Sequence, residues 1–324
     1  MSVLLGIDIG GSGSRVAIRS GDGPRRELTG PRIGVTTGGS SVPETAIALL
    51  RRARELWPRE CAALDGVGLG ASGLATLVAR PDELARAMRA ELAGTSADRL
   101  SPVAVAIDAV TAHLGALGGR PGAIVALGTG AIAFGTDGLE IWRRVDGWGH
   151  LLGDRGGGAW IGNRGLEMAM RAHDGVDASG AALLVRARAR FGDPLEWPAQ
   201  LYTRDDRAGV LAGFVPEVAE LAASGDVAAT AIMAAAGEEA ARSGVAALAP
   251  GLAARLAATG GVFGAGGVLA SSFARTVTAL RADVEVTAPL GDPLDGALLL
   301  AGRVARGEVS THEPYVWTAG SIAR

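Results

Sequence analysis

Two segments of this chain share one pattern, and that pattern restricts the possible folds more than any other feature. Each has an apolar run, a short turn of glycine and hydroxyl residues, and a second apolar run: residues 3–19 turn at 10–14, and residues 123–134 turn at 128–130. Such runs and turns are typical of β-hairpins. Helical patterns follow each strand-rich region, so we expect an α/β fold, and a length of 324 residues fits about two domains.

The remaining periodicity predicts further strands and helices. We expect strands over 66–70, 103–107, 260–267 and 284–287, and helices over 40–61, 81–92, 111–117, 271–280 and 295–306. An Ala/Arg-rich helical region extends from residue 160 to about residue 256.

Composition excludes several functional classes. A hydrophobic fraction of 48% with 20% charged residues argues against disorder. The 31 basic residues are all Arg, so chemistry that needs a Schiff-base Lys or a GxxxxGK[ST] phosphate loop is excluded. A net charge of −3 gives no basic excess for nucleic acid. Cys61 alone can form neither a disulfide framework nor a cysteine zinc site, which fits a reducing compartment.

The hydropathy pattern contains no run of about 18 apolar residues, and the first residues lack the basic start of a signal peptide. We therefore expect a cytoplasmic protein that has neither a membrane nor a nucleic acid as partner.

The first hairpin turn is a candidate phosphate site. Glycine allows backbone N–H groups to approach an anion closely, and hydroxyls donate to phosphate oxygens. Asp8, just before the turn, can hold a hydrated Mg²⁺. The alternative is an ordinary tight turn, where Gly and Ser are common anyway. The candidate residues of this turn are Gly10, Gly11, Ser12, Gly13, Ser14 and Arg15.

The second turn, Gly128-Thr129-Gly130, has the same design, although a lone match of this kind also fits a type I′ hairpin. Two such turns in one chain are more telling. A nucleoside triphosphate gripped from two sides needs two phosphate-binding hairpins, one from each domain.

Asp108 ends the apolar run 103–107. Ligands of α/β folds bind at the carboxyl ends of strands, where an aspartate can accept a proton from a substrate hydroxyl. The competing interpretation is that Asp108 is the N-cap of a helix that begins near Thr111.

Two further glycine-rich segments are candidates. Residues 147–156 place Trp148, His150 and Asp154 among glycines, a pattern too broken for regular structure and typical of a functional loop. Asp154 can accept hydrogen bonds from sugar hydroxyls; alternatively, Trp148 packs in a core and Asp154 caps a helix. His150 has no metal-ligand partners at suitable spacing, so we expect no zinc. In residues 260–267 the glycines can let a flat adenine ring lie on the backbone.

These five segments, in this order, resemble the actin-like sugar kinases, and most specifically the BadF/BadG-type family that includes N-acetylglucosamine kinase. Gly147-Trp148-Gly149-His150 followed by Gly153-Asp154 resembles that family's G-W-G-H…G-D segment. The resemblance covers about residues 3–306. It implies a two-domain actin-like (ribonuclease H-like) ATPase fold with an interdomain cleft. The domains would be 1–111 with the closing helix 294–307, and 112–293 with a helical insertion.

The resemblance also implies residue roles. Asp8 would position Mg²⁺, and Asp108 would be the base for the sugar hydroxyl. The first turn, with Thr129 and Gly130, would bind the ATP phosphates. The implied adenosine contacts are Gly264, Gly266 and Gly267. The implied sugar contacts are Thr36, Thr37, Ser72, Gly73, Asp108, Gly147, Trp148 and Asp154.

The implied activity is ATP- and Mg²⁺-dependent phosphorylation of an amino sugar, N-acetylglucosamine at O6, with glucosamine or N-acetylmuramic acid as alternatives; we expect a homodimer. Some positions depart from the family pattern. Ser12 replaces a Thr, Thr111 a common Gly, and Arg155 a common Glu. The family's early Ser-Thr-Asn segment has no clear match, and Thr36 or Thr37 is nearest. Of two rival functions, a reductase-activating ATPase needs cluster-binding cysteines that Cys61 cannot supply. A non-catalytic sugar or nucleotide sensor would not need Asp108.

Overall fold

The computed structural model describes residues 1–11, 13–36, 39–94 and 101–320, and the chain divides into two compact units. Unit 1 comprises Met1–Arg120 and Pro289–Arg324, and unit 2 comprises Pro121–Ala288. The boundary expected after residue 111 falls inside helix α5 (Asp108–Leu117), and the one after residue 293 falls at the start of α13 (Pro293–Ala305). Both helices belong to unit 1 as whole elements because they pack on each other and on its sheet.

Unit 1 is built on a six-stranded sheet of order β13-β7-β6-β1-β2-β3. Strands β1, β6 and β7 are parallel, whereas β2, β3 and β13 run antiparallel to their neighbours. The strands are β1 Val3–Gly10, β2 Gly13–Ser20, β3 Arg26–Gly30, β6 Gly66–Ala71, β7 Val103–Ile107 and β13 Val316–Ala319. A separate two-stranded sheet pairs β4 (Val35–Thr36) with β5 (Gly39–Ser40).

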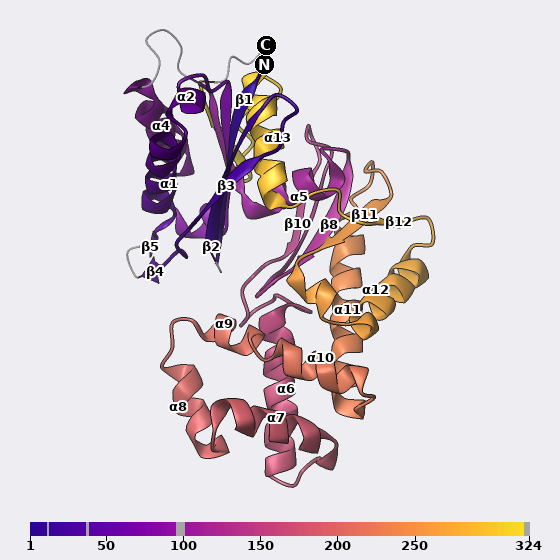
Figure 1. Cartoon of the computed structure of the whole chain (residues 1–324). Helices are drawn as coiled ribbons and strands as arrows, with labels where there is room; N and C mark the ends of the chain where they lie inside the picture. Colours follow the sequence, from indigo (N-terminus) through magenta and orange to yellow (C-terminus); the bar gives the residue numbers. More distant parts are fainter. Residues whose placement is uncertain (12, 37–38, 95–100, 321–324) are drawn as a thin grey trace. The chain divides into compact units, whose positions relative to one another are not determined.

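Helices cover both faces of this sheet. Helices α1 (Val42–Leu56) and α4 (Pro81–Glu91) lie on one face, and α5 and α13 lie on the other (Figure 1). The single helix expected over 40–61 is wrong: α1 ends at Leu56 and the short α2 (Pro58–Cys61) follows. Pro58, at the start of α2, lacks a backbone N–H and therefore cannot continue the helical hydrogen bonds of α1. The short elements α3 (Leu74–Leu77) and η1 (Leu92–Gly94) complete the described helices of the unit.

Unit 2 contains a five-stranded sheet of order β10-β9-β8-β11-β12, in which β8, β11 and β12 are parallel. The strands are β8 Gly122–Leu127, β9 Ala131–Thr136, β10 Trp142–Asp146, β11 Arg255–Thr259 and β12 Glu285–Thr287. Both predicted hairpins, β1–β2 and β8–β9, are confirmed.

The helices of unit 2 follow β10 and β11. They are α6 Gly158–His173, α7 Ala181–Phe191, α8 Trp197–Tyr202, α9 Arg207–Ala212, α10 Val215–Ala223, α11 Val227–Ala247 and α12 Gly267–Leu280, with 3₁₀ turns η2 Ala178–Gly180, η3 Pro194–Glu196 and η4 Gly261–Ala265. The strand expected over 260–267 is wrong, since β11 ends at Thr259 and η4 follows. Gly260 turns the chain with φ +98°, which ends the extended run.

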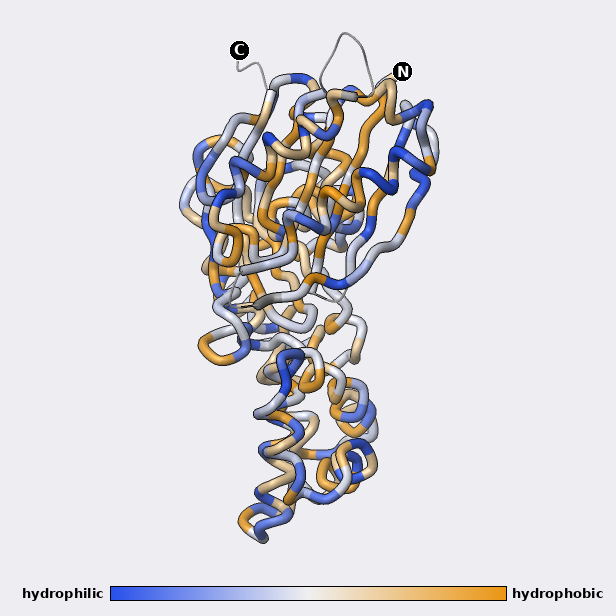
Figure 2. Tube along the Cα trace, turned by 90° about the vertical axis from the view of Figure 1, so that its left-hand side faces the viewer, coloured by the Kyte–Doolittle hydropathy of each residue, from blue (hydrophilic) through white to orange (hydrophobic). Residues whose placement is uncertain are grey.

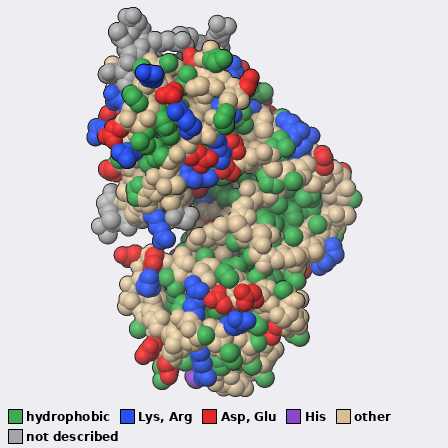
Figure 3. All heavy atoms as spheres, viewed as in Figure 1, with side chains coloured by type: hydrophobic (Ala, Val, Ile, Leu, Met, Phe, Trp, Pro, Cys, Tyr) green, Lys and Arg blue, Asp and Glu red, His purple; other side chains and the backbone are tan. Residues whose placement is uncertain are grey.

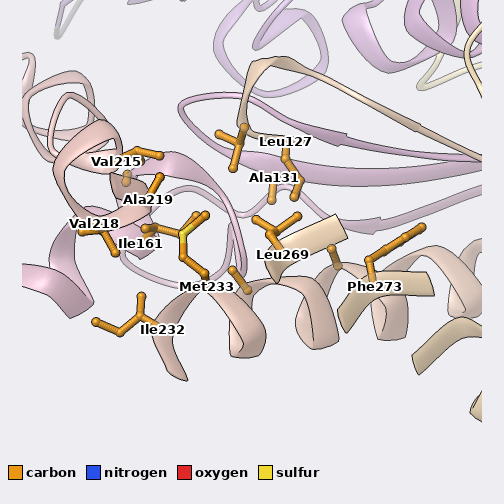
Figure 4. Close-up of a cluster of buried hydrophobic side chains, with 14 of the residues drawn as sticks. Leu127, Ala131, Ile161, Val215, Val218, Ala219, Ile232, Met233, Leu269 and Phe273 are labelled. Atoms are coloured by element: carbon orange, nitrogen blue, oxygen red, sulfur yellow. The ribbon is translucent and has the colours of Figure 1, made fainter. Parts of the chain in front are cut away.

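One apolar core joins the sheet of unit 2 to its helices. Leu127 and Ala131 from the hairpin lie close to Met233 of α11 and Leu269 of α12 (Figure 4). Helices α6, α7 and α10 extend the same core and each keeps other residues outside it. Hydrophobic and hydrophilic stretches alternate along the chain in Figure 2. Burial of one amphipathic face therefore stabilises the helical region.

No single helix in the described part of the chain is long and apolar enough to cross a membrane. Residues 207–223 and 227–247 are long and apolar enough only when taken together, and they bend by 115° at the break between them. Their apolar residues contribute to the core of unit 2.

On the face shown in Figure 3, acidic and basic side chains are interspersed.

Strand β6 is rich in glycine because two helices lie directly on it. A Cβ on Gly68 would collide with the carbonyl of Ala297 in α13. A Cβ on Gly70 would collide with the hydroxyl and methyl groups of Thr111 in α5. Thr111 is fully buried, so its side chain fills the space that Gly70 leaves empty.

We predict that Gly70→Ala lowers the free energy of unfolding by about 1–3 kcal/mol, the usual cost of overpacking a core. Thr111→Ala in the same chain should restore part of this loss, because it removes the two atoms that lie closest to the new methyl group. Urea unfolding of both single variants and the double variant measures the coupling. Gly11→Ala is the control, since its Cβ meets nothing within 4 Å. Strictly additive losses would show that Thr111 is not the obstacle.

Candidate active site

The parallel register of unit 1 brings several predicted residues to one edge of its sheet. Ile9 of β1 pairs with Ala71 of β6, and Ala71 pairs with Ile107 of β7. The chain leaves the sheet just after these three positions. The edge therefore presents the β1–β2 turn, Ser72 with Gly73, and Asp108, as expected for ligand binding at the carboxyl ends of strands.

Asp108 is the first residue of α5 and follows β7 without a loop. Its Oδ1 accepts the N–H of Ala109 at 2.9 Å, and the Thr111 hydroxyl donates to its carbonyl at 3.0 Å. The alternative that Asp108 caps a helix starting near Thr111 is wrong, because Ile107 is the N-cap and the helix already includes Asp108. The N–H of Ile107 donates to the carbonyl of Tyr315, just before β13, at 3.1 Å. Asp108, the candidate base, therefore lies between β7, which is hydrogen-bonded to Tyr315, and the first turn of α5, which is hydrogen-bonded through Thr111.

Two glycines of the β1–β2 turn, Gly11 and Gly13, leave open space beside their backbone. A Cβ on Gly11 or Gly13 would meet no atom within 4 Å, so the space beside this backbone is available to a ligand. Ser12, predicted to donate a hydroxyl, lies outside the described residues. Ser14 is buried, and its hydroxyl donates to the carbonyl of Pro31 at 2.8 Å. We therefore assign the Ser14 side chain to the packing of the hairpin.

Asp8 is held by Arg15. Nη2 of Arg15 lies 2.9 Å from Oδ2 of Asp8, and Nη1 lies 2.8 Å from Oδ2 of Asp292. Burial raises the pKa of Asp8 and outweighs the hydrogen bond and charge of Arg15, which lower it. For Asp292, burial also acts to raise the pKa, but hydrogen bonds from Arg25, the Asp295 N–H and Arg15 together hold it well below its usual range.

The remaining sugar candidates of unit 1 lie beside this edge or outside the described part. The N–H of Ser72 donates to the carbonyl of Ile9 at 2.8 Å, which places Ser72 beside the first turn. Gly73 precedes α3 with φ +71°, a conformation that favours glycine. Thr36 ends β4, but neither its side chain nor Thr37 is among the described groups.

In unit 2, helix α6 orients the second hairpin turn. The carbonyls of Gly128 and Thr129 accept the N–H groups of Gly158 and Ala159, both at 2.8 Å. The Thr129 residue remains exposed. The turn is thereby attached to the start of α6 through its carbonyl groups, while Thr129 as a residue remains open to solvent.

The late glycine segment lies next to this turn. Strand β11 pairs with β8, Thr259 opposite Ala126, and Gly260 packs against the backbone of Leu127. Gly264, Gly266 and Gly267 would each place a Cβ in open space. A flat ring can therefore approach the backbone here without a side chain in the way.

The irregular loop 147–157 is organised by two aspartates in left-handed conformations, Asp146 with φ +60° and Asp154 with φ +55°. Asp146 accepts the N–H groups of Asp154 at 2.7 Å and Arg155 at 2.9 Å. Asp154 in turn accepts the Gly149 N–H at 3.1 Å, and burial raises its pKa. Sequence reasoning missed Asp146; an aspartate directly before Gly147, at the start of the glycine-rich segment, is the signal that could have revealed it.

This loop contacts the second hairpin turn. A Cβ on Gly130 would collide with the Asp154 carboxylate, so the carboxylate lies directly against this glycine. Thr129, Gly130 and Asp154 are thus brought together within unit 2.

Trp148 is 63% exposed, and the guanidinium of Arg144 stacks over its ring at 4.5 Å. Asp154 does not cap α6, since Gly157 is the N-cap of that helix.

Comparison with known proteins identifies the family. The model of the BadF/BadG/BcrA/BcrD ATPase family matches residues 5–301. The chain belongs to this family. A curated N-acetylmuramic acid/N-acetylglucosamine kinase from Clostridium acetobutylicum is 36% identical over 75 residues, which cover 23% of this chain and 24% of that protein. The alignment with this relative therefore spans about a quarter of its length.

Solved structures share the fold across most of the chain. A candidate N-acetylglucosamine kinase from Chromobacterium violaceum has 29% identity and a TM-score of 0.68, covering 93% of this chain and 99% of that chain. A glucokinase of the ROK family from Streptomyces griseus, solved with glucose and AMPPNP, has 18% identity and a TM-score of 0.59, covering 93% of this chain and 100% of that chain. The expected mixed α/β, two-domain ATPase fold is thereby confirmed.

Membership of this ATPase family implies ATP use, and the described residues fit that requirement. Gly11 and Gly13 of the first turn and Gly128 of the second leave open space beside their backbones, as phosphates require. No group of three His, Cys, Asp or Glu residues in the described ranges could cage a metal ion. A single carboxylate such as Asp8 nevertheless suits Mg²⁺, which keeps most of its waters and binds phosphates. Burial raises the pKa of Cys61 to about 11, which disfavours a thiolate ligand at neutral pH.

The opposite pKa shifts of Asp8 and Asp292 predict opposite effects of neutralising each carboxylate. The raised pKa of Asp8 means that ionising it costs stability, so Asp8→Asn should raise the melting temperature at pH 7. The lowered pKa of Asp292 means that its charge stabilises the fold above about pH 4. Asp292→Asn should therefore lose about 1 kcal/mol, or about 2–4 °C, at this partly exposed site.

Thermal unfolding from pH 3 to pH 8 checks this pair of predictions. The deficit of Asp292→Asn should shrink as the pH falls below about 4, because the unfolded wild-type chain then takes up a proton that the native carboxylate, with its lowered pKa, does not. The gain of Asp8→Asn should fade on acidification as well. Equal losses of melting temperature in Asp8→Asn and Asp292→Asn at pH 7 would contradict the prediction that the two substitutions have opposite effects.

Proposed function

We propose that this protein is an ATP-dependent kinase of an amino sugar, with N-acetylglucosamine phosphorylated at O6 as the first candidate. One observation carries the proposal: the glycine turn after Asp8 follows β1, Asp108 follows β7, and these two parallel strands, with β6 between them, end at the same sheet edge. A phosphate cradle and a base for a hydroxyl are the two elements that phosphoryl transfer to an alcohol requires.

In the proposed reaction, Asp108 accepts the proton of the sugar hydroxyl as that oxygen attacks the terminal phosphorus of ATP, and ADP leaves. The β1–β2 turn and the turn with Thr129 and Gly130 would hold the phosphates through backbone N–H and hydroxyl groups. Gly264, Gly266 and Gly267 would receive the adenosine. Asp8 would hold Mg²⁺ through its waters, and the cation would supply neutralisation of phosphate charge.

The substrate class rests on relatives. The curated relative from Clostridium acetobutylicum acts on N-acetylmuramic acid and N-acetylglucosamine, and the structure from Chromobacterium violaceum is described as a candidate N-acetylglucosamine kinase. Gly147, Trp148 and Asp154 would contact the sugar, with Ser72, Gly73, Thr36 and Thr37 as further contacts. N-acetylmuramic acid is therefore the second candidate substrate.

The decisive experiment is ADP release with N-acetylglucosamine, N-acetylmuramic acid, glucosamine and neutral hexoses as acceptors. We expect an amino sugar to give the highest kcat/KM. In Asp108→Asn, kcat should fall about 10²–10⁴-fold, because the general base is lost while the side chain keeps its shape. Sugar and nucleotide binding should change little.

Asp82→Asn is the matched control, since Asp82 is an aspartate on the exposed side of α4 paired with Arg86. It should leave kcat unchanged. Near-wild-type kcat in Asp108→Asn would remove that residue from the mechanism. Activity with no sugar of the panel, in a chain that still hydrolyses ATP, would contradict the sugar-kinase proposal.

Asp154 gives a separate prediction about the sugar. If its carboxylate accepts hydrogen bonds from sugar hydroxyls, Asp154→Ala should weaken binding of N-acetylglucosamine by about 10–150-fold in calorimetry. Asp146→Asn is the control, because Asp146 organises the same loop through backbone N–H groups alone. Equal losses in both variants would mean that loop order, and not a direct contact of Asp154, sets the affinity. Circular dichroism verifies that both variants are folded.

A further inference from the structure

Arg15 links two carboxylates that lie far apart in the sequence. Its Nη2 donates to Asp8 at 2.9 Å and its Nη1 donates to Asp292 at 2.8 Å. Asp8 is on β1, Arg15 is on β2, and Asp292 is the N-cap of α13. We call this pair of contacts the Arg15 bridge. Sequence reasoning placed Arg15 among the ATP contacts, whereas its guanidinium is engaged with protein carboxylates.

The two ends of the Arg15 bridge differ in how firmly they are held. At the Asp292 end, the carboxylate accepts two hydrogen bonds from Arg25, at 2.9 and 3.0 Å, and caps α13 through the N–H of Asp295 at 2.9 Å. A carboxylate at a helix N-terminus is further stabilised by the helix dipole. Asp292 is therefore a fixed anion with several partners.

At the Asp8 end, the carboxylate is the more buried partner, with a side chain 16% exposed against 34% for Arg15. A carboxylate taken out of water needs a cation or hydrogen-bond donors nearby. Arg15 supplies such a cation before any metal arrives. Because Arg15 also holds Asp292, it keeps an anionic partner if Asp8 turns to another cation.

We propose that Arg15 is a positioning residue that acts as a resident counter-cation: it holds Asp8 at the open β1–β2 turn and yields that carboxylate to a divalent cation while staying anchored on Asp292. This inference rests on the proposed role of Asp8 in holding Mg²⁺. In this role, Arg15 competes with the metal ion for the Asp8 carboxylate and does not contact the nucleotide directly. No bond between heavy atoms is made or broken; one ionic partner of Asp8 replaces another.

The test is direct binding of Mn²⁺ by electron paramagnetic resonance, in the presence of a saturating non-hydrolysable ATP analogue. Arg15→Gln should bind Mn²⁺ about five- to twentyfold more tightly than wild type, because the competing ion pair is gone. Arg15→Lys should lie between them, since an ammonium group cannot bridge two carboxylates as a planar guanidinium does. Affinity for the analogue without metal should be unchanged in both variants.

Arg25→Gln is the matched control. It removes the same charge from the same network and touches Asp292, but the structure gives it no contact with Asp8. The Mn²⁺ affinity of Arg25→Gln should stay within about twofold of wild type, because solvent and salt largely screen the effect of a charge that does not contact Asp8. Melting temperatures of all variants report folding separately.

Several outcomes would overturn the inference. Equal tightening in Arg15→Gln and Arg25→Gln would reduce the effect to net charge. Unchanged or weaker Mn²⁺ binding in a folded Arg15→Gln would exclude competition. Weaker binding of the metal-free analogue would make Arg15 a phosphate contact. Wild-type protein that binds the analogue but no Mn²⁺ would instead refute the metal role of Asp8 in the proposed function, and the counter-cation role with it.

Discussion

Close backbone packing of α13 on the first sheet is the constraint on which unit 1 depends. Gly66 and Gly68 of β6 lie against the carbonyls of Ala301 and Ala297, at a distance that leaves no room for a Cβ. Gly6 of β1 meets the same helix at Leu298. A helix near the C-terminal end of the sequence thereby becomes part of the N-terminal unit, and van der Waals contact along its whole length stabilises that arrangement.

The chemistry of the sheet edge follows from this packing. The N-cap of α13 places Asp292 where Arg15 can reach it, so the helix that closes the unit also supplies an anion to the neighbourhood of Asp8. Strand β13 adds a second support, because the residue before it accepts the N–H of Ile107 beside Asp108. The neighbourhoods of Asp8, through Arg15, and of Asp108, through Ile107, are therefore supported by residues from the last tenth of the chain.

Sequence reasoning succeeded where the signal is local. The hairpins at 3–19 and 123–134, the buried strands 66–70 and 103–107, and the irregular loop around Trp148 are all determined by neighbouring residues. It failed where tertiary contacts decide. Strands β3 and β10 lie at sheet edges and lack an apolar run, and β13 is only four residues long. Strand β11 was misplaced because a glycine run after it imitates the end of a strand.

By itself, the sequence determined the residue types that chemistry needs: glycines and hydroxyls in two turns, Asp8 and Asp108 at strand ends, no lysine and a single cysteine. Only the tertiary structure decided which of these groups meet. The pairing of Arg15 with Asp292, the inward hydrogen bond of Ser14 and the Asp146 support of the Asp154 loop join residues through folded geometry. Ion pairs and hydrogen bonds require atoms within about 3 Å, and no spacing along a chain specifies that distance across a fold.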